Sequence, residues 1–129
     1  MSEQLALIAR SLLVDVLTVL AAAPAEQVAW MERHDVEADD LAIGFDHDYQ
    51  LVPTMVAGEF LDPSAVPDLR AIDGVLDAMS GPENAARWTT DALATDPGWS
   101  RVRTLARQVL VCLNGDWRLP MPTFHADRY

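Results

Sequence analysis

Apolar residues recur at intervals of three and four along the first part of the chain. Residues spaced in this way lie on one face of an α-helix, so the pattern predicts a helix near the N-terminus. Ser2 is placed to cap its first turn, and Pro24 to end it. The apolar face consists of Leu5, Ile8, Leu12, Val16 and Leu20, with Leu13 and Leu17 widening the stripe.

The chain up to about residue 60 predicts three shorter helices. The first covers residues 25–33, and the second reaches Tyr49 from a cap at Asp39 or Asp40. The third begins with Pro53 in its first turn and ends at a glycine a few residues later.

The second half is punctuated more clearly. Asp-Pro pairs at residues 62–63 and 96–97 each combine a helix cap with a proline at the first helical position. The predicted helices end at Ser80-Gly81-Pro82 and at Asn114-Gly115, and a short turn between them is capped by Thr89 or Thr90.

These signals predict one fold. We expect an all-α, compact single-domain bundle of about five helices over residues 1–115, followed by an extended, proline-containing arm over residues 116–129. Sustained alternation typical of strands is missing from the sequence, although residues 118–124 could form an edge strand.

Charge is distributed very unevenly along the chain of 129 residues, whose formal net charge is −11. Residues 1–64 carry twelve acidic side chains and two arginines, a net of −10. The densest stretch, residues 32–48, holds seven carboxylates against Arg33 alone. Like charges packed this closely repel one another, and a fold that needs them only for solubility would spread them out. Their concentration therefore predicts a docking surface for a basic partner. The acidic balance argues against binding nucleic acid or an anionic membrane.

Compartment can be predicted from the cysteine content and the N-terminus. Cys112 is the single cysteine, so no intramolecular disulfide can form, and a cytoplasmic location is the simplest expectation. We expect its thiol to be buried and inert beside the last helix's core face. A signal peptide is not expected, because Glu3 precedes the first arginine and Asp15 interrupts the apolar run. We also expect the stretch over residues 11–23 to be too short and too charged to span a bilayer.

Two histidine–carboxylate clusters offer an alternative function. His34, Asp35, Asp46 and His47 are ligand types for zinc, iron or manganese, as in metal-dependent hydrolases. The spacing is unfavourable, because neighbouring helical residues diverge by about 100° around the axis. We therefore expect no metal and no cofactor. The third histidine, His125, lies in the arm.

Trp30 is the aromatic residue closest to the acidic stretch, and it could anchor an interface or pack in the core. Three arginines, Arg101, Arg103 and Arg107, lie along the last helix. They could pair with the acidic half, which would weaken the docking hypothesis, or form an opposite pole.

Residues 69–110 contain a series of caps and core positions with a recognisable arrangement. Its members are Ile72-Asp73, Leu76-Asp77-Ala78-Met79-Ser80-Gly81, Asn84, Trp88-Thr89, Ala92-Leu93, Trp99 and Val102-Arg103-Thr104-Leu105-Ala106-Arg107. This stretch resembles small acidic helical proteins of bacteria that act as immunity proteins in polymorphic toxin systems. The resemblance implies an all-α fold and a role in binding a toxin, and it transfers no site residue.

Together these observations predict a non-catalytic acidic binding protein, an immunity- or antitoxin-type inhibitor that docks on a basic protein such as a toxin. The alternatives are the metal-dependent hydrolase and a self-associating structural or regulatory subunit, a homodimer. The expected partner-binding residues are Asp35, Glu37, Asp39, Asp40, Asp46 and Asp48 as a charged face, with Trp30 and Tyr49 as anchors.

Overall fold

The computed structural model describes residues 2–123, which form seven α-helices, two 3₁₀-helices and no strand. The all-α prediction is therefore confirmed, with seven helices in place of about five. In chain order the elements are α1 (Glu3–Ala21), α2 (Pro24–His34), α3 (Ala38–Tyr49), α4 (Val52–Ala57), η1 (Pro63–Ala65), α5 (Val66–Ala78), η2 (Pro82–Trp88), α6 (Ala92–Thr95) and α7 (Pro97–Asn114).

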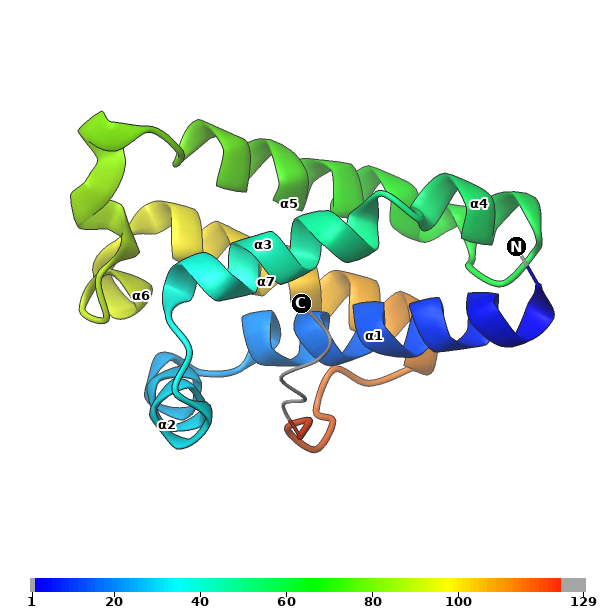
Figure 1. Cartoon of the computed structure of the whole chain (residues 1–129), viewed down its shortest axis with the longest axis horizontal. Helices are drawn as coiled ribbons and strands as arrows, with labels where there is room; N and C mark the ends of the chain where they lie inside the picture. The colour runs from blue at the N-terminus through cyan, green and yellow to red at the C-terminus, as the bar shows by residue number, and fades with distance from the viewer. Residues whose placement is uncertain (1, 124–129) are drawn as a thin grey trace.

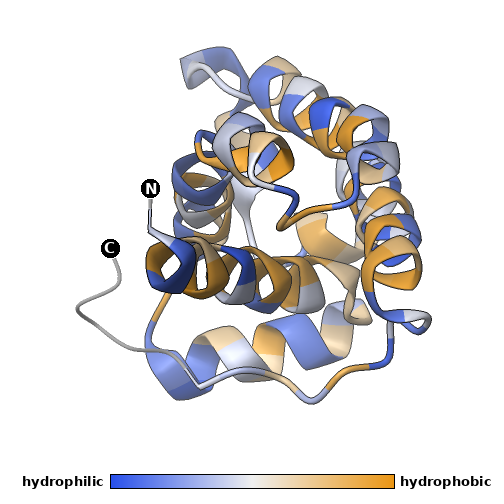
Figure 2. Cartoon of the chain, turned by 90° about the vertical axis from the view of Figure 1, so that its right-hand side faces the viewer, coloured by the Kyte–Doolittle hydropathy of each residue, from blue (hydrophilic) through white to orange (hydrophobic). Residues whose placement is uncertain are grey.

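Four helices, α1, α3, α5 and α7, surround one core. α7 packs against both α1 and α5, and α3 completes the group by contacting α1 and α5 (Figure 1). The short helices α2 and α6 lie together at one end of this group. Seen from the end of the bundle, each long helix carries both hydrophilic and hydrophobic residues (Figure 2), as amphipathic helices around a shared core should.

The predicted apolar stripe of α1 is buried only in the second half of the helix. Leu13, Leu17 and Leu20 are fully buried, whereas Leu5 and Ile8 are 58% and 48% exposed. In these first turns Ala6 (2% exposed) and Ala9 (5% exposed) face the core instead, so the predicted stripe was wrong there: it followed the large apolar residues and passed over the alanines on the buried side.

Several helix ends follow the sequence signals. The Ser2 hydroxyl accepts a hydrogen bond from the Leu5 amide (3.2 Å), and the Asp96 carboxylate accepts one from the Gly98 amide (2.7 Å). Asp62 caps η1 in the same way, and its bonds from Ser64 lower the pKa of its carboxyl. Gly115 ends α7 with a φ of 81°, a left-handed conformation that suits glycine.

The predicted cap of α3, Asp39 or Asp40, is wrong by two or three residues. Glu37 occupies the cap position, and the Asp40 carboxylate accepts a hydrogen bond from the Glu37 amide (2.8 Å). This reciprocal arrangement is a capping box, which satisfies two amides of the first turn at once. The prediction missed it because Glu is an unusual cap residue. The 3₁₀-helix η2 was also not foreseen.

The C-terminus of α1 is closed by side chains from α2 and α7. The Gln27 amide, on α2, donates to the carbonyls of Val19 (3.0 Å) and Leu20 (3.1 Å). From α7, Arg107 donates to Ala21 (2.9 Å) and Arg103 to Ala22 (3.1 Å). The last turn of α1 has no basic residue of its own, so α7 supplies the cations that its negative dipole end favours.

Residues 116–123 form the described part of the arm and lie against the bundle without regular structure. The guanidinium of Arg107 sits 3.9 Å from the centre of the Trp117 ring. Farther along, the Pro122 carbonyl accepts a hydrogen bond from the Trp30 indole (2.8 Å). The suggested edge strand does not form over residues 118–123; Phe124 and His125 lie outside the described residues.

The thiol of Cys112 is exposed, and the expectation of a buried thiol is wrong. Cys112 lies one position outside the core face of α7, and its sulfur is 3.1 Å from the Ser64 hydroxyl.

By length and composition, α1 could cross a membrane, which corrects the expectation drawn from residues 11–23. That expectation omitted the first turns of the helix, which begins at Glu3. Half of the apolar window is buried inside the fold. Core helices of water-soluble proteins and signal sequences have the same character, so the cytoplasmic location stays a prediction.

Candidate protein-docking site

Local structure turns the acidic stretch towards solvent. Asp35 ends α2 in a left-handed conformation (φ 54°), which Asp tolerates better than most residues. The chain then enters α3 at Glu37. Asp39 and Asp40 fall in the first turn of α3, where the positive end of the helix dipole favours carboxylates. The fold can therefore hold these like charges close together at modest cost.

Five of the six expected carboxylates are exposed. We call this set, Asp35, Glu37, Asp39, Asp40 and Asp46, the acidic face. None of its members forms an ion pair with another residue between 2 and 123.

Four arginines of the second half are engaged elsewhere in the fold. Arg87 pairs with Asp96 (2.9 Å), and Arg118 with Asp116 (3.5 Å). Arg103 and Arg107 bind the carbonyls at the end of α1. The sequence left two possibilities open for the arginines of the last helix: ion pairs with the acidic half, or an opposite pole. Neither describes Arg103 and Arg107. Arg101 is exposed.

Asp48 does not belong to the acidic face, because it is only 1% exposed. Leu41 and Phe45 mark the buried side of α3, and Asp48 follows them at helical spacing. One of its oxygens lies 3.8 Å from Nδ1 of His47.

The two expected anchors are also turned away from solvent. Trp30 is 5% exposed and packs in the core, with its N–H bound to the arm. Tyr49 is half-buried and stacks on Phe45, with ring centres 5.6 Å apart. Of the two interpretations of Trp30, an interface anchor or a core residue, the structure therefore supports the core residue.

A different apolar residue occupies the middle of the acidic face. Ile43 is 60% exposed and lies between Asp39 and Asp46 at helical spacing, so the three share one side of α3. The sequence contained this signal, because Ile43 falls opposite the apolar side that Leu41 and Phe45 define.

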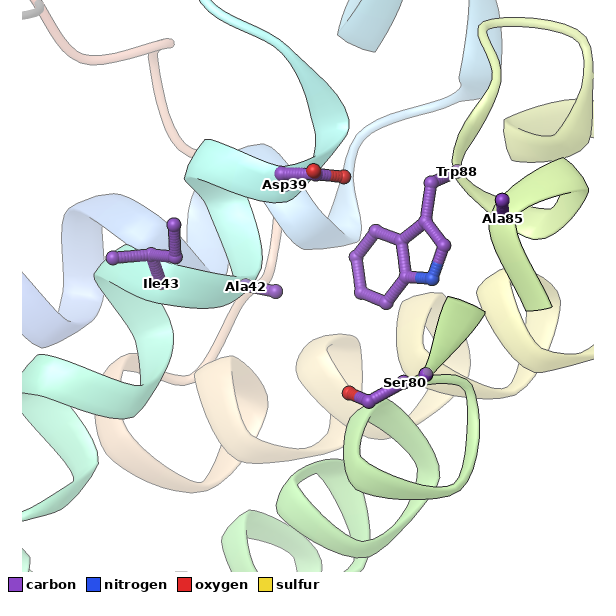
Figure 3. A pocket seen from close by; sticks show the side chains of 7 residues that line it. Asp39, Ala42, Ile43, Ser80, Ala85 and Trp88 are labelled. Carbon is purple, nitrogen blue, oxygen red and sulfur yellow. The ribbon is translucent and has the colours of Figure 1, made fainter. Parts of the chain in front are cut away.

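A hollow of about 420 Å³ opens beside this side of α3. Figure 3 shows the indole ring of Trp88 between the first turn of α3 and the η2 segment, with Ser80 below it. The labelled residues that line it are Asp39, Ala42, Ile43, Ser80, Ala85 and Trp88.

A second hollow, of about 490 Å³, adjoins the first. Trp88 lines both, so we describe them together as the Trp88 groove. The carboxylates of Glu32, Asp35 and Glu37 border the second hollow, as Asp39 borders the first.

Trp88 is held firmly in this position. Its N–H donates to the Met79 carbonyl (2.8 Å), and its ring meets Trp99 edge-on with centres 5.3 Å apart. The neighbouring Arg87 forms two hydrogen bonds to the Asp96 carboxylate, which lower the pKa of that carboxyl. The sequence left open whether Trp88, which borders a loop, anchors the core or an interface, because its surroundings come from α2, α3, η2 and α7 and depend on how these elements pack.

The residues of the alternative metal site are not gathered. Among residues 2–123, no group of three or more His, Cys, Asp or Glu side chains is placed to hold a metal ion. The His34 ring instead packs on Trp30, with ring centres 4.7 Å apart, and His47 is on α3 beside Asp48.

Asp73, on α5, is affected by the negative charge of Asp46, a member of the acidic face. Burial, followed by the negative charges of Asp46 and Asp77, raises the pKa of Asp73. A carboxyl whose pKa is higher in the folded state destabilises the fold increasingly as the pH rises from the usual pKa of the group to the raised one, and fully above it.

Asp73→Asn is therefore expected to stabilise the protein at pH 7 by a few tenths of a kcal/mol. Urea unfolding at descending pH checks this, because the gain should disappear as wild-type Asp73 becomes protonated. An advantage that persists unchanged in acid would show that charge is not its cause.

Comparisons with protein families, with curated proteins and with solved structures find no match to this chain.

Proposed function

We propose that this chain is a non-catalytic binding protein that docks its acidic face on a basic partner protein, as an immunity- or antitoxin-type inhibitor does. One observation carries the proposal. The carboxylates of the acidic face are exposed and free of ion pairs within residues 2–123, while four arginines are engaged elsewhere in the fold.

The physical logic needs no catalysis. A nuclease toxin must carry a basic surface that attracts phosphates. An acidic protein can compete for that surface, because opposite charges steer the two proteins together and raise the association rate. An exposed apolar side chain such as Ile43, in the middle of the charged set, would then slow dissociation.

The test is affinity capture of the tagged chain from its native host at about 50 and 300 mM salt, with partners identified by mass spectrometry and their affinity then measured. We expect a stoichiometric basic protein whose affinity falls about tenfold or more across this range. Capture of the chain alone, as a homodimer, would contradict the proposal.

A charge-neutralised variant sharpens the test. Asp35→Asn, Asp39→Asn and Asp46→Asn remove three charges and leave the capping box of Glu37 and Asp40 intact. We expect this triple variant to bind the partner about tenfold more weakly, with a shallower salt dependence.

The matched control removes three carboxylates outside the acidic face, by Glu3→Gln, Glu59→Gln and Asp77→Asn. It has the same net charge as the triple variant and should bind as the wild type does. If both triple variants lose affinity equally, overall charge and not the acidic face drives binding.

A further inference from the structure

We infer that the Trp88 groove receives an arginine side chain from a basic segment of the partner protein, with the indole ring as its aromatic wall. The inference rests on the proposed function, since it names the part of the partner that the docking site holds. It differs from the sequence prediction in moving the aromatic contact from Trp30 to Trp88.

The indole ring is already ordered by the fold. Its N–H is bound to Met79, and the ring packs perpendicular to that of Trp99. The ring lines both hollows, of which Figure 3 shows the first, so a ligand in either hollow meets an aromatic surface that is fixed before it binds. A prearranged surface of this kind lowers the entropic cost of binding.

The charge of the groove selects a cation. Carboxylates from α2 and from the start of α3 line it, and none of its lining residues is basic. The guanidinium nearest in sequence, that of Arg87, is bound by two hydrogen bonds to Asp96, and no guanidinium of the described residues lies over the Trp88 ring. A cation over an indole face, with carboxylates beside it, is stabilised by both.

The same chain contains an example of the contact. Arg107 and Arg118 lie over the ring of Trp117, at 3.9 and 4.9 Å from its centre. There the protein provides both the ring and the cations, whereas at Trp88 it provides the ring and the carboxylates. A planar guanidinium also stacks on an aromatic face better than an ammonium does, which favours arginine over lysine.

The size of the groove favours a protein segment over a small cation. The two hollows, of about 420 and 490 Å³, meet at Trp88 and extend from the α2–α3 connection to Ile43. This extent can hold neighbouring residues of an extended chain around the arginine. Ile43 then offers an apolar contact at one end.

The inference can be tested by an NMR titration of the isotope-labelled protein with the acetylated, amidated peptide Ser-Gly-Arg-Gly-Ser. The indole N–H signal of Trp88 is assigned from Trp88→Phe. We expect this signal and the amide signals of Asp39 and Gly81 to shift with the arginine peptide. The same peptide with citrulline, which is neutral and nearly the same shape, should leave them in place.

Variants give the second readout. We expect Trp88→Ala to weaken peptide binding about fivefold to tenfold, and Trp117→Ala to leave it unchanged. Because Trp88 also contacts Trp99, Ala85→Phe is used as well; it fills the first hollow from an exposed position and should block binding equally. Equal shifts with citrulline, or full affinity in both groove variants, would overturn the inference.

The two proposals fail in different ways. If the triple variant loses the partner while Trp88→Ala and Ala85→Phe retain it, the acidic face binds the partner and the groove does not. If the triple variant also retains the partner, the proposed function itself is wrong.

Discussion

Trp99→Ala is expected to lower the free energy of unfolding by about 4 kcal/mol. Trp99 is 1% exposed, and its N–H donates to the Arg87 carbonyl (2.8 Å). Its removal leaves a large cavity at the start of α7 and an unsatisfied carbonyl in η2. It also removes the support on which the Trp88 ring rests.

Urea unfolding followed by circular dichroism measures this loss. The control is Trp117→Ala, because Trp117 is half-buried at the arm and contributes about 1 kcal/mol through its arginine contacts. Similar losses from both substitutions would mean that the core around Trp99 closes over the cavity, and that this end of the bundle is more plastic than its packing indicates.

Arg103→Met should cost about 3 kcal/mol, the second largest effect that we expect. Its guanidinium donates to the carbonyls of Ala22 (3.1 Å) and Leu93 (2.8 Å) and to the Gln27 side chain (3.4 Å). Methionine keeps most of the apolar stem and removes the donors. The carbonyls then remain in a partly buried place without their partners, which is costlier than the loss of the bonds alone.

Arg101→Met is the matched control on the same helix. Arg101 is exposed, so its substitution should change the free energy of unfolding by less than about 0.5 kcal/mol. Burial, and then the charge of Arg107, lowers the pKa of Arg103, but an arginine stays charged at neutral pH. If Arg103→Met unfolds at the same urea concentration as Arg101→Met, water must reach the end of α1 and replace the guanidinium.

The helix ends were predictable because their signals are local. A cap such as Asp96 and a stop such as Gly115 act on backbone groups within a few residues, so the sequence alone indicates them. The roles of Arg103 and Gln27 were not predictable in this way. Their acceptors lie on other elements, and the pairing depends on how α1, α2 and α7 pack.

The candidate site was predictable in part. The acidic stretch was evident from the sequence, but treating it as a continuous run hid the fact that α3 has an inner and an outer side. Helical spacing from Leu41 and Phe45 places Asp48 on the buried side of α3 and Ile43 on its exposed side. The positions of Asp48 and Ile43 could therefore have been predicted from the sequence. The hydrogen bond from the Trp30 indole to the Pro122 carbonyl could not be predicted, because the two residues lie 92 positions apart.

The closure of α1 by α7 has a consequence for synthesis on the ribosome. The Ala21 carbonyl and its donor Arg107 are 86 residues apart. At about 5–20 residues per second, the most apolar helix of the chain emerges roughly 4–17 s before the side chains that complete its last turn. During that interval α1 is a segment that membrane-targeting factors and chaperones recognise by its apolar surface. On this order of translation we expect α1, and not the acidic face, to be the segment that nascent-chain chaperones contact.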